Sequence, residues 1–350
     1  MTNPNILFTG TNVAELVDCS IPEVVPGQVR VRLVRSTVSS GTERANVTGC
    51  NVVSIWDPPD APVVWPRQAG YSSSGVVDVV GEGVSSVRPG DRVAMSWTHH
   101  SQYVVVPEDR VYKLPEAVSF EAGALAHIAT FPMAAIRKCG LELGESAIVM
   151  GQGILGQLAV MLLKCAGATP VIAADPIAEK REQALNIGAD YAFDPTAPDF
   201  REKVLAVCPL EDRGIYTGER ASGVKVAIEV TGLGVGLNNV LDVMAPMGRV
   251  ALLGCTRNSD FLVDYYHKVH GRGVALLGAH TWARPTVESS HGLFTHRDDA
   301  LTFLKLLSLG RLSVENYVAD VRSPAACGAV YANLAKGGAF PITQFDWTML

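Results

Sequence analysis

The sequence predicts an α/β protein with a doubly wound parallel sheet and a second, β-rich domain. Two observations carry this prediction. Residues 146–175 read as strand, glycine-rich turn, helix and strand, and further strand and helix patterns alternate to about residue 282. Residues 1 to about 125 instead show short apolar runs separated by turn signals, which is typical of a β-barrel-like domain.

Composition and charge exclude several classes of protein. With 350 residues, 48% of them hydrophobic, the chain is long enough for two domains. The net charge of −6, without a basic run, argues against nucleic acid and anionic membranes as partners. No apolar stretch reaches the ~20 residues of a membrane span, and residues 1–10 show no signal peptide. The seven cysteines stand singly, which fits a reduced, cytoplasmic protein and argues against a cysteine-built zinc site.

The amino-terminal region is expected to form mainly strands. Residues 29–34 alternate apolar and polar side chains, and residues 101–106 run apolar into Pro107. Helical character begins near Ser119, which suits an N-cap, and continues to about residue 137.

In the central region, apolar strand patterns alternate with helical ones. The expected strands are 147–150, 171–174, 191–193, 226–230, 249–253 and 274–277. The expected helices are 155–165, 176–187, 199–207 and 237–244. The polar segment 209–223 is expected to be a surface loop. This alternation indicates a parallel sheet that binds its ligand at the carboxyl ends of the strands.

The last segment, about 283–350, contains helix patterns at 297–309 and 325–334 and a strand pattern at 342–347. Because it is too short to form a domain alone, we expect it to pack on the amino-terminal region.

The glycine-rich turn of the central region matches a dinucleotide-binding fingerprint. Gly151, Gly153 and Gly156 have the G-x-G-x-x-G spacing between a strand and a helix. The first glycine permits a tight turn, the second lets a pyrophosphate approach the backbone, and the third lets the helix pack closely on the strand. The helix start offers N–H groups and a positive dipole end to phosphate. The alternative is a glycine-rich turn in an unrelated α/β protein.

Asp175 supplies the second half of the fingerprint. It ends the next strand and lies 19 residues beyond Gly156, near the spacing expected for an acid that binds ribose. A carboxylate there accepts hydrogen bonds from both ribose hydroxyls and repels a 2′-phosphate. The sequence therefore predicts NAD rather than NADP as the cofactor.

Further motifs extend this pattern along the chain. They are Gly-Glu-Gly-Val at 81–84, Gly-Asp-Arg-Val at 90–93, Gly-Ala-Asp at 188–190, Glu-Val-Thr-Gly at 229–232, Gly-Arg-Val at 248–250, Leu-Leu-Gly at 252–254 and Phe-Asp-Trp at 345–347. With them, the whole chain resembles the medium-chain dehydrogenase/reductase superfamily, and within it the alcohol and polyol dehydrogenases. The resemblance implies a GroES-like catalytic domain of residues 1–127, completed by 283–350, and a Rossmann NAD-binding domain of residues 128–282. It also implies a small-molecule substrate and a homodimer or homotetramer.

The same resemblance implies specific cofactor contacts. Ile154 and Leu155 match residues whose backbone N–H groups meet the pyrophosphate. Val230 and Thr231 match a strand end beside the cofactor. Leu253 and Ala279 match residues whose backbone meets the carboxamide of the nicotinamide, and Thr130 matches a residue that packs on the nicotinamide ring.

The chain departs from its zinc-dependent relatives at their metal ligands. Where those relatives place a ligand cysteine, this chain has Ser40, followed by Gly-Thr-Glu. Their ligand histidine matches Tyr71, and their third ligand matches Ala126. Zinc prefers thiolate, imidazole or carboxylate ligands, so we expect no metal at these positions. The opposing interpretation is that zinc does bind, with His99, His100 or His127 as a ligand.

Without zinc, protein groups have to handle the substrate oxygen. Tyr71 is the first candidate, although it can simply fill the vacated volume. Thr42 matches a hydroxyl that relays the substrate proton in zinc relatives, but a turn threonine also bonds its own backbone. His100 and Ser40 complete the candidate catalytic set, and Glu43 is expected to form a structural salt bridge.

The sequence therefore predicts a zinc-independent, NAD-dependent dehydrogenase that interconverts an alcohol and its ketone, the alcohol being a secondary one on a polyol, sugar or cyclic metabolite. One alternative is an NADPH-type quinone or enoyl reductase of the same superfamily. The other is a non-catalytic nucleotide-binding protein, since the relay histidine of the relatives is Ala45 here.

Overall fold

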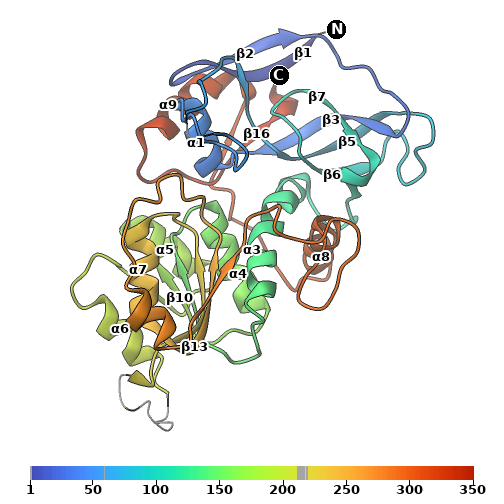
Figure 1. Cartoon of the computed structure of the whole chain (residues 1–350). Coiled ribbons are helices and arrows are strands. Elements are labelled where there is room, and N and C mark those ends of the chain that lie inside the picture. Colours follow the sequence, from blue (N-terminus) through green and yellow to red (C-terminus); the bar gives the residue numbers. More distant parts are fainter. Residues whose placement is uncertain (1, 59, 211–216, 218–219) are drawn as a thin grey trace. The chain divides into compact units, whose positions relative to one another are not determined.

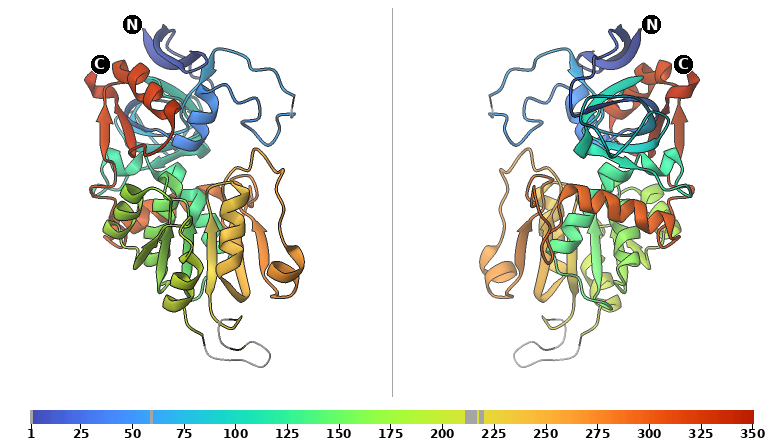
Figure 2. Two further views of the ribbon diagram at one scale, coloured as in Figure 1. Left: turned by 90° about the vertical axis from the view of Figure 1, so that its left-hand side faces the viewer. Right: turned by 90° about the vertical axis from the view of Figure 1, so that its right-hand side faces the viewer.

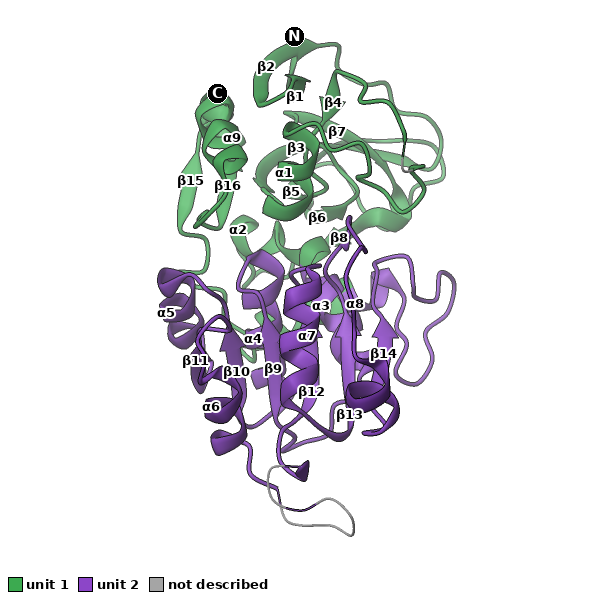
Figure 3. Cartoon of the chain, turned by 60° about the vertical axis from the view of Figure 1, so that its left-hand side comes forward, with its two compact units in different colours: residues 1–128, 300–350 green, residues 129–299 purple. Residues whose placement is uncertain are grey.

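The computed structural model describes residues 2–58, 60–210, 217 and 220–350 (Figure 1). The chain divides into two compact units, a first unit of residues 1–128 with 300–350 and a second unit of residues 129–299 (Figure 3). Residues 283–299 group with the second unit, whereas the sequence analysis placed that boundary at residue 282.

The second unit is built on a six-stranded parallel sheet. In spatial order its strands are β11 (Tyr191–Phe193), β10 (Val171–Ala174), β9 (Ala147–Met150), β12 (Val224–Glu229), β13 (Met244–Leu252) and β14 (Ala275–Gly278). The helices that connect them are α4 (Ile154–Cys165), α5 (Ala178–Asn186), α6 (Phe200–Val207) and α7 (Gly234–Val243). Helices flank the sheet on both faces (Figure 2). The predicted α/β fold with a doubly wound parallel sheet is confirmed.

The strand order places a ligand site at the centre of this sheet. The chain runs outward from β9 to β10 and β11, and then returns to β12 on the other side of β9. Met150 pairs in register with Ala174 of β10 and Glu229 of β12. The segments that follow these three residues therefore begin at one edge of the sheet, at the switch point where open α/β sheets bind ligands.

The first unit is built on mainly antiparallel strands from both ends of the chain, with β15 and β16 pairing in parallel. A small sheet contains β1 (Asn3–Gly10), β2 (Val13–Cys19) and β4 (Arg67–Gln68). The larger sheet has the order β15 (Asp320–Arg322), β16 (Thr343–Asp346), β3 (Gln28–Thr37), β5 (Ser72–Val80), β6 (Arg92–Ser96) and β8 (Val111–Lys113), with β7 (Tyr103–Pro107) also paired to β3. Gln344 pairs with Thr37, so the last segment packs on the amino-terminal region as expected.

Each unit has its own apolar core. In the first unit, Val29, Val31 and Leu33 of β3 alternate inward and meet Tyr331 and Phe345 from the carboxy-terminal segment. In the second unit, β9, β10 and β12 are almost wholly buried, because helices cover both faces of a parallel sheet.

The predicted helices of the carboxy-terminal segment form within two residues of their expected bounds, as α8 (His296–Ser308) and α9 (Cys327–Lys336). The predicted N-cap is also confirmed, because the Ser119 side chain accepts a hydrogen bond from the Ala122 N–H. The single helix predicted after it is instead two, α2 (Phe120–Gly123) and α3 (Ala126–Lys138). The surface loop predicted at 209–223 lies largely outside the described residues.

Sequence analysis missed α1 (Ser40–Val47), which it treated as a turn. Gly41 and Thr42 are poor helix formers, and the helix has only eight residues. The burial of Glu43, Ala45 and Val47 and the contacts of Glu43 with His100 and Tyr331 override that local preference. Among the described residues, no helix is long and apolar enough to span a membrane.

Candidate active site

The glycine loop after β9 has the geometry that a bound dinucleotide requires. Gly151 has φ +98°, which an L side chain rarely adopts. A Cβ added at Gly156 would lie 1.8 Å from the Gly151 carbonyl oxygen, so only glycine lets α4 start this close to the turn. A Cβ at Gly153 would meet nothing within 4 Å. The backbone at Gly153 is therefore open where a pyrophosphate would approach the N-terminus of α4, at Ile154 and Leu155.

Asp175 lies beside this loop at the end of β10. It is 4% exposed, and its carboxylate accepts hydrogen bonds from the Gln152 N–H at 2.8 Å and the Ile177 N–H at 2.9 Å. The Lys180 ammonium lies 3.8 Å from the same carboxylate. Each carboxylate oxygen has a second lone pair, so these contacts leave acceptor capacity for ribose hydroxyls.

The turn after β12 is fixed by Glu229. Its carboxylate accepts hydrogen bonds from the Thr231 N–H at 2.8 Å, the Thr231 hydroxyl and the Gly232 N–H at 3.1 Å. Burial raises the pKa of Glu229, and these hydrogen bonds oppose the rise. A Cβ at Gly151 would lie 2.9 Å from the Thr231 methyl group, so the Val230–Thr231 turn sits against the glycine loop.

The candidates for the nicotinamide end follow β13 and β14. The Leu253 N–H donates to the Glu229 carbonyl at 2.9 Å, and the Ala279 N–H donates to the Leu252 carbonyl at 3.0 Å. Thr130 on α3 is buried, and its carbonyl accepts a hydrogen bond of 2.7 Å from Arg284. The predicted cofactor residues thus follow the carboxyl ends of the strands, except Thr130. Thr130 lies on α3, and its carbonyl is hydrogen-bonded to Arg284 in the segment after β14. Their chemistry and spacing fit a dinucleotide.

In the first unit, Tyr71 lies in a cluster of aromatic and hydroxyl side chains. Its hydroxyl is hydrogen-bonded to the hydroxyl of Ser39. Its ring centroid lies 5.1 Å from that of His127, edge to face, and His127 in turn lies 4.5 Å from Trp97. The Trp97 N–H donates to the Tyr71 carbonyl at 2.8 Å, and Trp97 has φ +61°. A bulky residue held in the left-handed region is uncommon and occurs more often at functional sites.

Ser40 and Thr42 lie in the first turn of α1, next to this cluster in the chain. Ser40 is the first residue of the helix, and the Thr42 carbonyl accepts a hydrogen bond of 3.0 Å from the Asn46 amide. The serine that is hydrogen-bonded to the Tyr71 hydroxyl is Ser39, not Ser40. Ser39 was not among the candidate catalytic residues predicted from the sequence. A serine directly before a helix suggests an N-cap, so its position gave no signal of this contact.

His100 is fully buried, and both of its ring nitrogens are engaged within the first unit. Nδ1 lies 2.7 Å from the Ser36 hydroxyl, and Nε2 lies 3.2 Å from the Glu43 carboxylate. His100, which belongs to the candidate catalytic set, therefore makes buried hydrogen bonds within the first unit in this structure. Glu43 is 1% exposed, and its carboxylate makes a buried, structural contact with His100.

The three positions that match zinc ligands in the relatives are Ser40, Tyr71 and Ala126. In the described part of the chain, no group of three or more His, Cys, Asp or Glu side chains is arranged to hold a metal ion. Ser72 follows Tyr71 and donates its hydroxyl to the Ala124 carbonyl at 2.7 Å.

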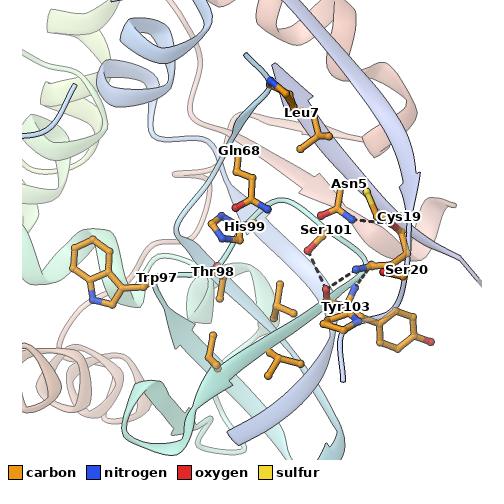
Figure 4. Close-up of a pocket in the computed structure, with 16 residues that line it drawn as sticks. Asn5, Leu7, Cys19, Ser20, Gln68, Trp97, Thr98, His99, Ser101 and Tyr103 are labelled. Carbon is orange, nitrogen blue, oxygen red and sulfur yellow. Dashed lines mark hydrogen bonds between the residues drawn. The ribbon is translucent and has the colours of Figure 1, made fainter. Parts of the chain in front are cut away.

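A cavity of about 430 Å³ lies in the first unit beside β7 (Figure 4). Its lining contains no Asp, Glu, Lys or Arg and includes Asn5, Gln68, Thr98 and His99; burial lowers the pKa of His99, which disfavours its charged form. Trp97 also lines it, and Figure 4 shows the indole directed away from the cluster of Asn5, Ser101 and Tyr103. The second unit has a cavity of about 380 Å³ between the start of α7 and residues 255–261.

Comparison with known proteins gives a family match for part of the chain. Residues 155–290 match the model of the zinc-binding dehydrogenase family. A (R,R)-butanediol dehydrogenase of Bacillus subtilis is 29% identical over 259 residues, which cover 66% of this chain and 71% of the relative. The matched family segment does not include Ser40, Tyr71 or Ala126, so it carries no information about a metal at those positions.

The fold matches solved structures over almost the whole chain. An Escherichia coli CFT073 protein described as a short chain alcohol dehydrogenase, complexed with NADH, has a TM-score of 0.80 at 19% identity, with 99% of each chain covered. A zinc-binding dehydrogenase from Sinorhizobium meliloti, bound to NADP, has a TM-score of 0.78 at 20% identity, again with 99% of each chain covered. Residues 155–290 are thus similar to zinc-binding dehydrogenases, the matched 259 residues are similar to a butanediol dehydrogenase, and the fold is that of the solved dehydrogenases.

Proposed function

We propose that the protein is a zinc-independent, NAD-dependent oxidoreductase that interconverts a secondary alcohol and its ketone. The substrate class is a polyol, a sugar or a cyclic metabolite. The observation that carries the proposal is the Tyr71–Ser39 hydroxyl pair. It stands where zinc-dependent relatives place a ligand histidine, and it offers a proton-transferring group where this chain has no metal ligand.

The cofactor part of the proposal rests on the second unit. The open backbone at Gly153, the close approach at Gly156 and the carboxylate of Asp175 fit a dinucleotide with a free 2′-hydroxyl. A bound dinucleotide would supply the nicotinamide ring as the hydride acceptor. Asp175 opposes a 2′-phosphate by charge, which favours NAD over NADP.

The first unit is proposed to handle the substrate oxygen. As the alcohol carbon loses its hydride, the hydroxyl proton passes to the oxygen of an ionised Tyr71, which acts as the general base and becomes the neutral phenol. In the reverse direction the Tyr71 phenol returns the proton to the ketone oxygen. Trp97 and His127 fix the plane of the Tyr71 ring, since both make ring contacts with it or with each other.

A metal assay and one variant test this proposal. We expect purified protein to contain far less than one zinc per chain and to keep its rate of alcohol oxidation after treatment with a chelator. Tyr71→Phe should lower kcat by about 100-fold or more, the scale of general acid–base catalysis. Tyr112→Phe is a matched control, because it removes another phenol hydroxyl that bonds a serine, here Ser96 at 3.1 Å. Stoichiometric zinc, or an unchanged rate in Tyr71→Phe, would overturn the mechanism.

The same preparation separates the alternatives. A marked preference for NADPH with activity on conjugated C=C bonds would instead indicate a quinone or enoyl reductase. Tight NADH binding without turnover in a broad screen of alcohols would indicate a non-catalytic nucleotide-binding protein. Both outcomes are read from binding and rate measurements with NADH and NADPH side by side.

A further inference from the structure

A buried polar network lies directly beneath the Tyr71–Ser39 pair. Its centre is the carboxylate of Glu43, on α1. Oε1 accepts a hydrogen bond of 2.7 Å from the Ser39 N–H, and Oε2 contacts His100 Nε2 and the Tyr331 hydroxyl. His100 Nδ1 contacts the Ser36 hydroxyl, which also lies 2.8 Å from Nε1 of Trp347. These residues are at most 3% exposed, and they come from β3, the start of α1, the segment between β6 and β7, α9 and the carboxyl end of the chain.

The donors and acceptors of this network fix the tautomer of His100. The Trp347 indole N–H can only donate, so the Ser36 oxygen accepts from it. The Glu43 carboxylate can only accept, so Nε2 of a neutral His100 carries the proton and donates to it, and the Ser36 O–H donates to Nδ1. Burial and the neighbouring charge of Glu43 raise the pKa of Tyr331 well above its ordinary value, so its phenol remains a donor to Glu43. Every group is satisfied in this one arrangement, which makes the network rigid.

The network holds both partners of the hydroxyl pair. Glu43 binds the Ser39 backbone at both of its polar groups, because its own N–H also donates to the Ser39 carbonyl at 2.9 Å. His100 lies against Gly70, the residue before Tyr71, where an added Cβ would come within 2.8 Å of the imidazole ring. The His100 N–H also donates to the Ala69 carbonyl at 2.8 Å. The hydrogen-bonded Glu43–His100 pair thus contacts the backbone on both sides of the Tyr71–Ser39 hydrogen bond.

Ser39 departs from the usual behaviour of its position. It is the N-cap of α1, where a serine side chain normally accepts a hydrogen bond from the helix N–H groups. Here the Ser39 side chain makes no capping bond, and its hydroxyl is directed to Tyr71. The N–H of Ser39 is instead bound by Glu43, so the carboxylate secures the start of α1 while the hydroxyl contacts the phenol.

We propose that Ser39 is the hydrogen-bond partner that sets the Tyr71 phenol for proton transfer, and that Glu43 and His100 are positioning residues that hold this pair. The proposal rests on the proposed role of Tyr71. When Tyr71 carries negative charge before it accepts the alcohol proton, the Ser39 O–H donates to its oxygen and stabilises it. No bond to Ser39 is made or broken.

The central test is Ser39→Ala, compared with Ser39→Thr and with Ser96→Ala. Ser39→Ala should lower kcat by about 10- to 100-fold, the effect of losing a hydrogen bond to a charged group, with KM and NADH affinity unchanged. Ser39→Thr keeps a hydroxyl and should restore most of the rate. Ser96→Ala is the matched control, because it removes a buried serine hydroxyl that bonds Tyr112. Equal rates in Ser39→Ala and wild type would overturn the proposal.

A double-mutant cycle tests the positioning residues. Glu43→Gln keeps the size of the side chain but weakens its hold on Ser39. We expect Glu43→Gln to lower kcat in the wild-type background and to have little further effect in Ser39→Ala, because both act through one hydrogen bond. Fully additive losses would overturn the role of Glu43. If Glu43→Gln fails to fold, His100→Gln, which keeps a donor toward Glu43, replaces it in the same cycle.

A spectroscopic titration tests the coupling without turnover. The ultraviolet absorbance change on tyrosine ionisation is recorded for wild type and for Tyr71→Phe, and the difference isolates Tyr71. The titratable groups that the structure places near the hydroxyl pair are His127 on α3 and the Glu43–His100 pair. Ser39→Ala should shift the Tyr71 midpoint to higher pH, since the phenolate loses a donor, and Ser96→Ala should not. A protein that oxidises no alcohol would refute the proposed function, whereas an unshifted midpoint would refute the coupling.

Discussion

Ser39 and Asp175 are two polar residues whose surroundings differ in how far the sequence predicts them. Asp175 was selected from the sequence, whereas the contact of Ser39 with Tyr71 was not. Both stand at the end of a strand or the start of a helix, and both are held by backbone N–H groups. Asp175 accepts hydrogen bonds from Gln152 and Ile177, which direct its carboxylate to the glycine loop. Ser39 is held by Glu43, which leaves its hydroxyl for Tyr71. In each case a neighbouring backbone contact orients a polar group toward a function.

Asp175 carries the prediction of cofactor choice. Asp175→Ser should weaken NADH binding by about 10-fold or more, since hydrogen bonds to a charged group are lost. It should also bring NADPH affinity closer to that of NADH, because the repulsion of a 2′-phosphate disappears. Fluorescence titrations at one fixed salt concentration measure both constants. Asp199→Ser, which removes an exposed carboxylate bonded to Lys203 at the start of α6, is the control. Unchanged NADH affinity in Asp175→Ser would contradict the assignment.

Among the elements, the junction of β9 and α4 shows how closely packing and binding are combined. Gly156 is required because the helix passes within contact distance of the Gly151 carbonyl. Gly153, three residues earlier, has open space beside it and an ordinary negative φ of −79°. Gly156 thus allows the helix to pack closely on the turn, whereas Gly153 leaves open space beside the backbone, although both belong to the same fingerprint.

A pair of alanine variants separates these two roles. Gly156→Ala should lower the free energy of unfolding by about 1–3 kcal/mol, the usual effect of overpacking. Gly153→Ala should change stability by no more than about 0.5 kcal/mol, yet weaken NADH binding, because the new methyl group occupies the space left for the pyrophosphate. Chemical denaturation and NADH titration of both variants check this. A stable Gly156→Ala protein, or normal NADH binding by Gly153→Ala, would contradict the prediction.

At the scale of the whole molecule, the second unit is inserted in the sequence between two segments of the first unit, residues 1–128 and 300–350. The first unit takes both chain ends, and β16 completes its larger sheet by pairing with β3 about 300 residues earlier. The second unit ends its sheet at β14, whose outer edge is unpaired within the described residues. β14 is largely exposed, and Leu276 is 37% exposed. An exposed, apolar edge strand is suited to pairing with another chain.

We therefore expect the protein to be a homodimer or homotetramer that pairs through β14. Leu276→Lys should shift it toward the monomer, because like charges placed opposite each other across a strand pair repel. The mass in solution, measured by light scattering after size-exclusion chromatography, checks this. Val321→Lys is a matched control, since Val321 lies on β15, the edge strand of the other sheet, with the same 37% exposure. An unchanged mass in Leu276→Lys would show that another surface carries the assembly.

The sequence by itself determined the parallel sheet, the glycine loop and the place of Asp175, because these depend on local patterns of a few residues. Strand and helix periodicity, glycine spacing and the acid at a strand end are all readable along the chain. It also indicated Tyr71, because a single substitution stands out against a known motif.

Only the tertiary structure decided which residues surround Tyr71. Ser39, Trp97 and His127 lie far apart in the sequence and meet through antiparallel pairing and the start of α3. The contact of His100 with Glu43 likewise depends on burial, which no local pattern reveals. Hydrogen bonds between distant segments form only once the fold brings them together, so the cofactor loop was predictable from sequence and the surroundings of Tyr71 were not.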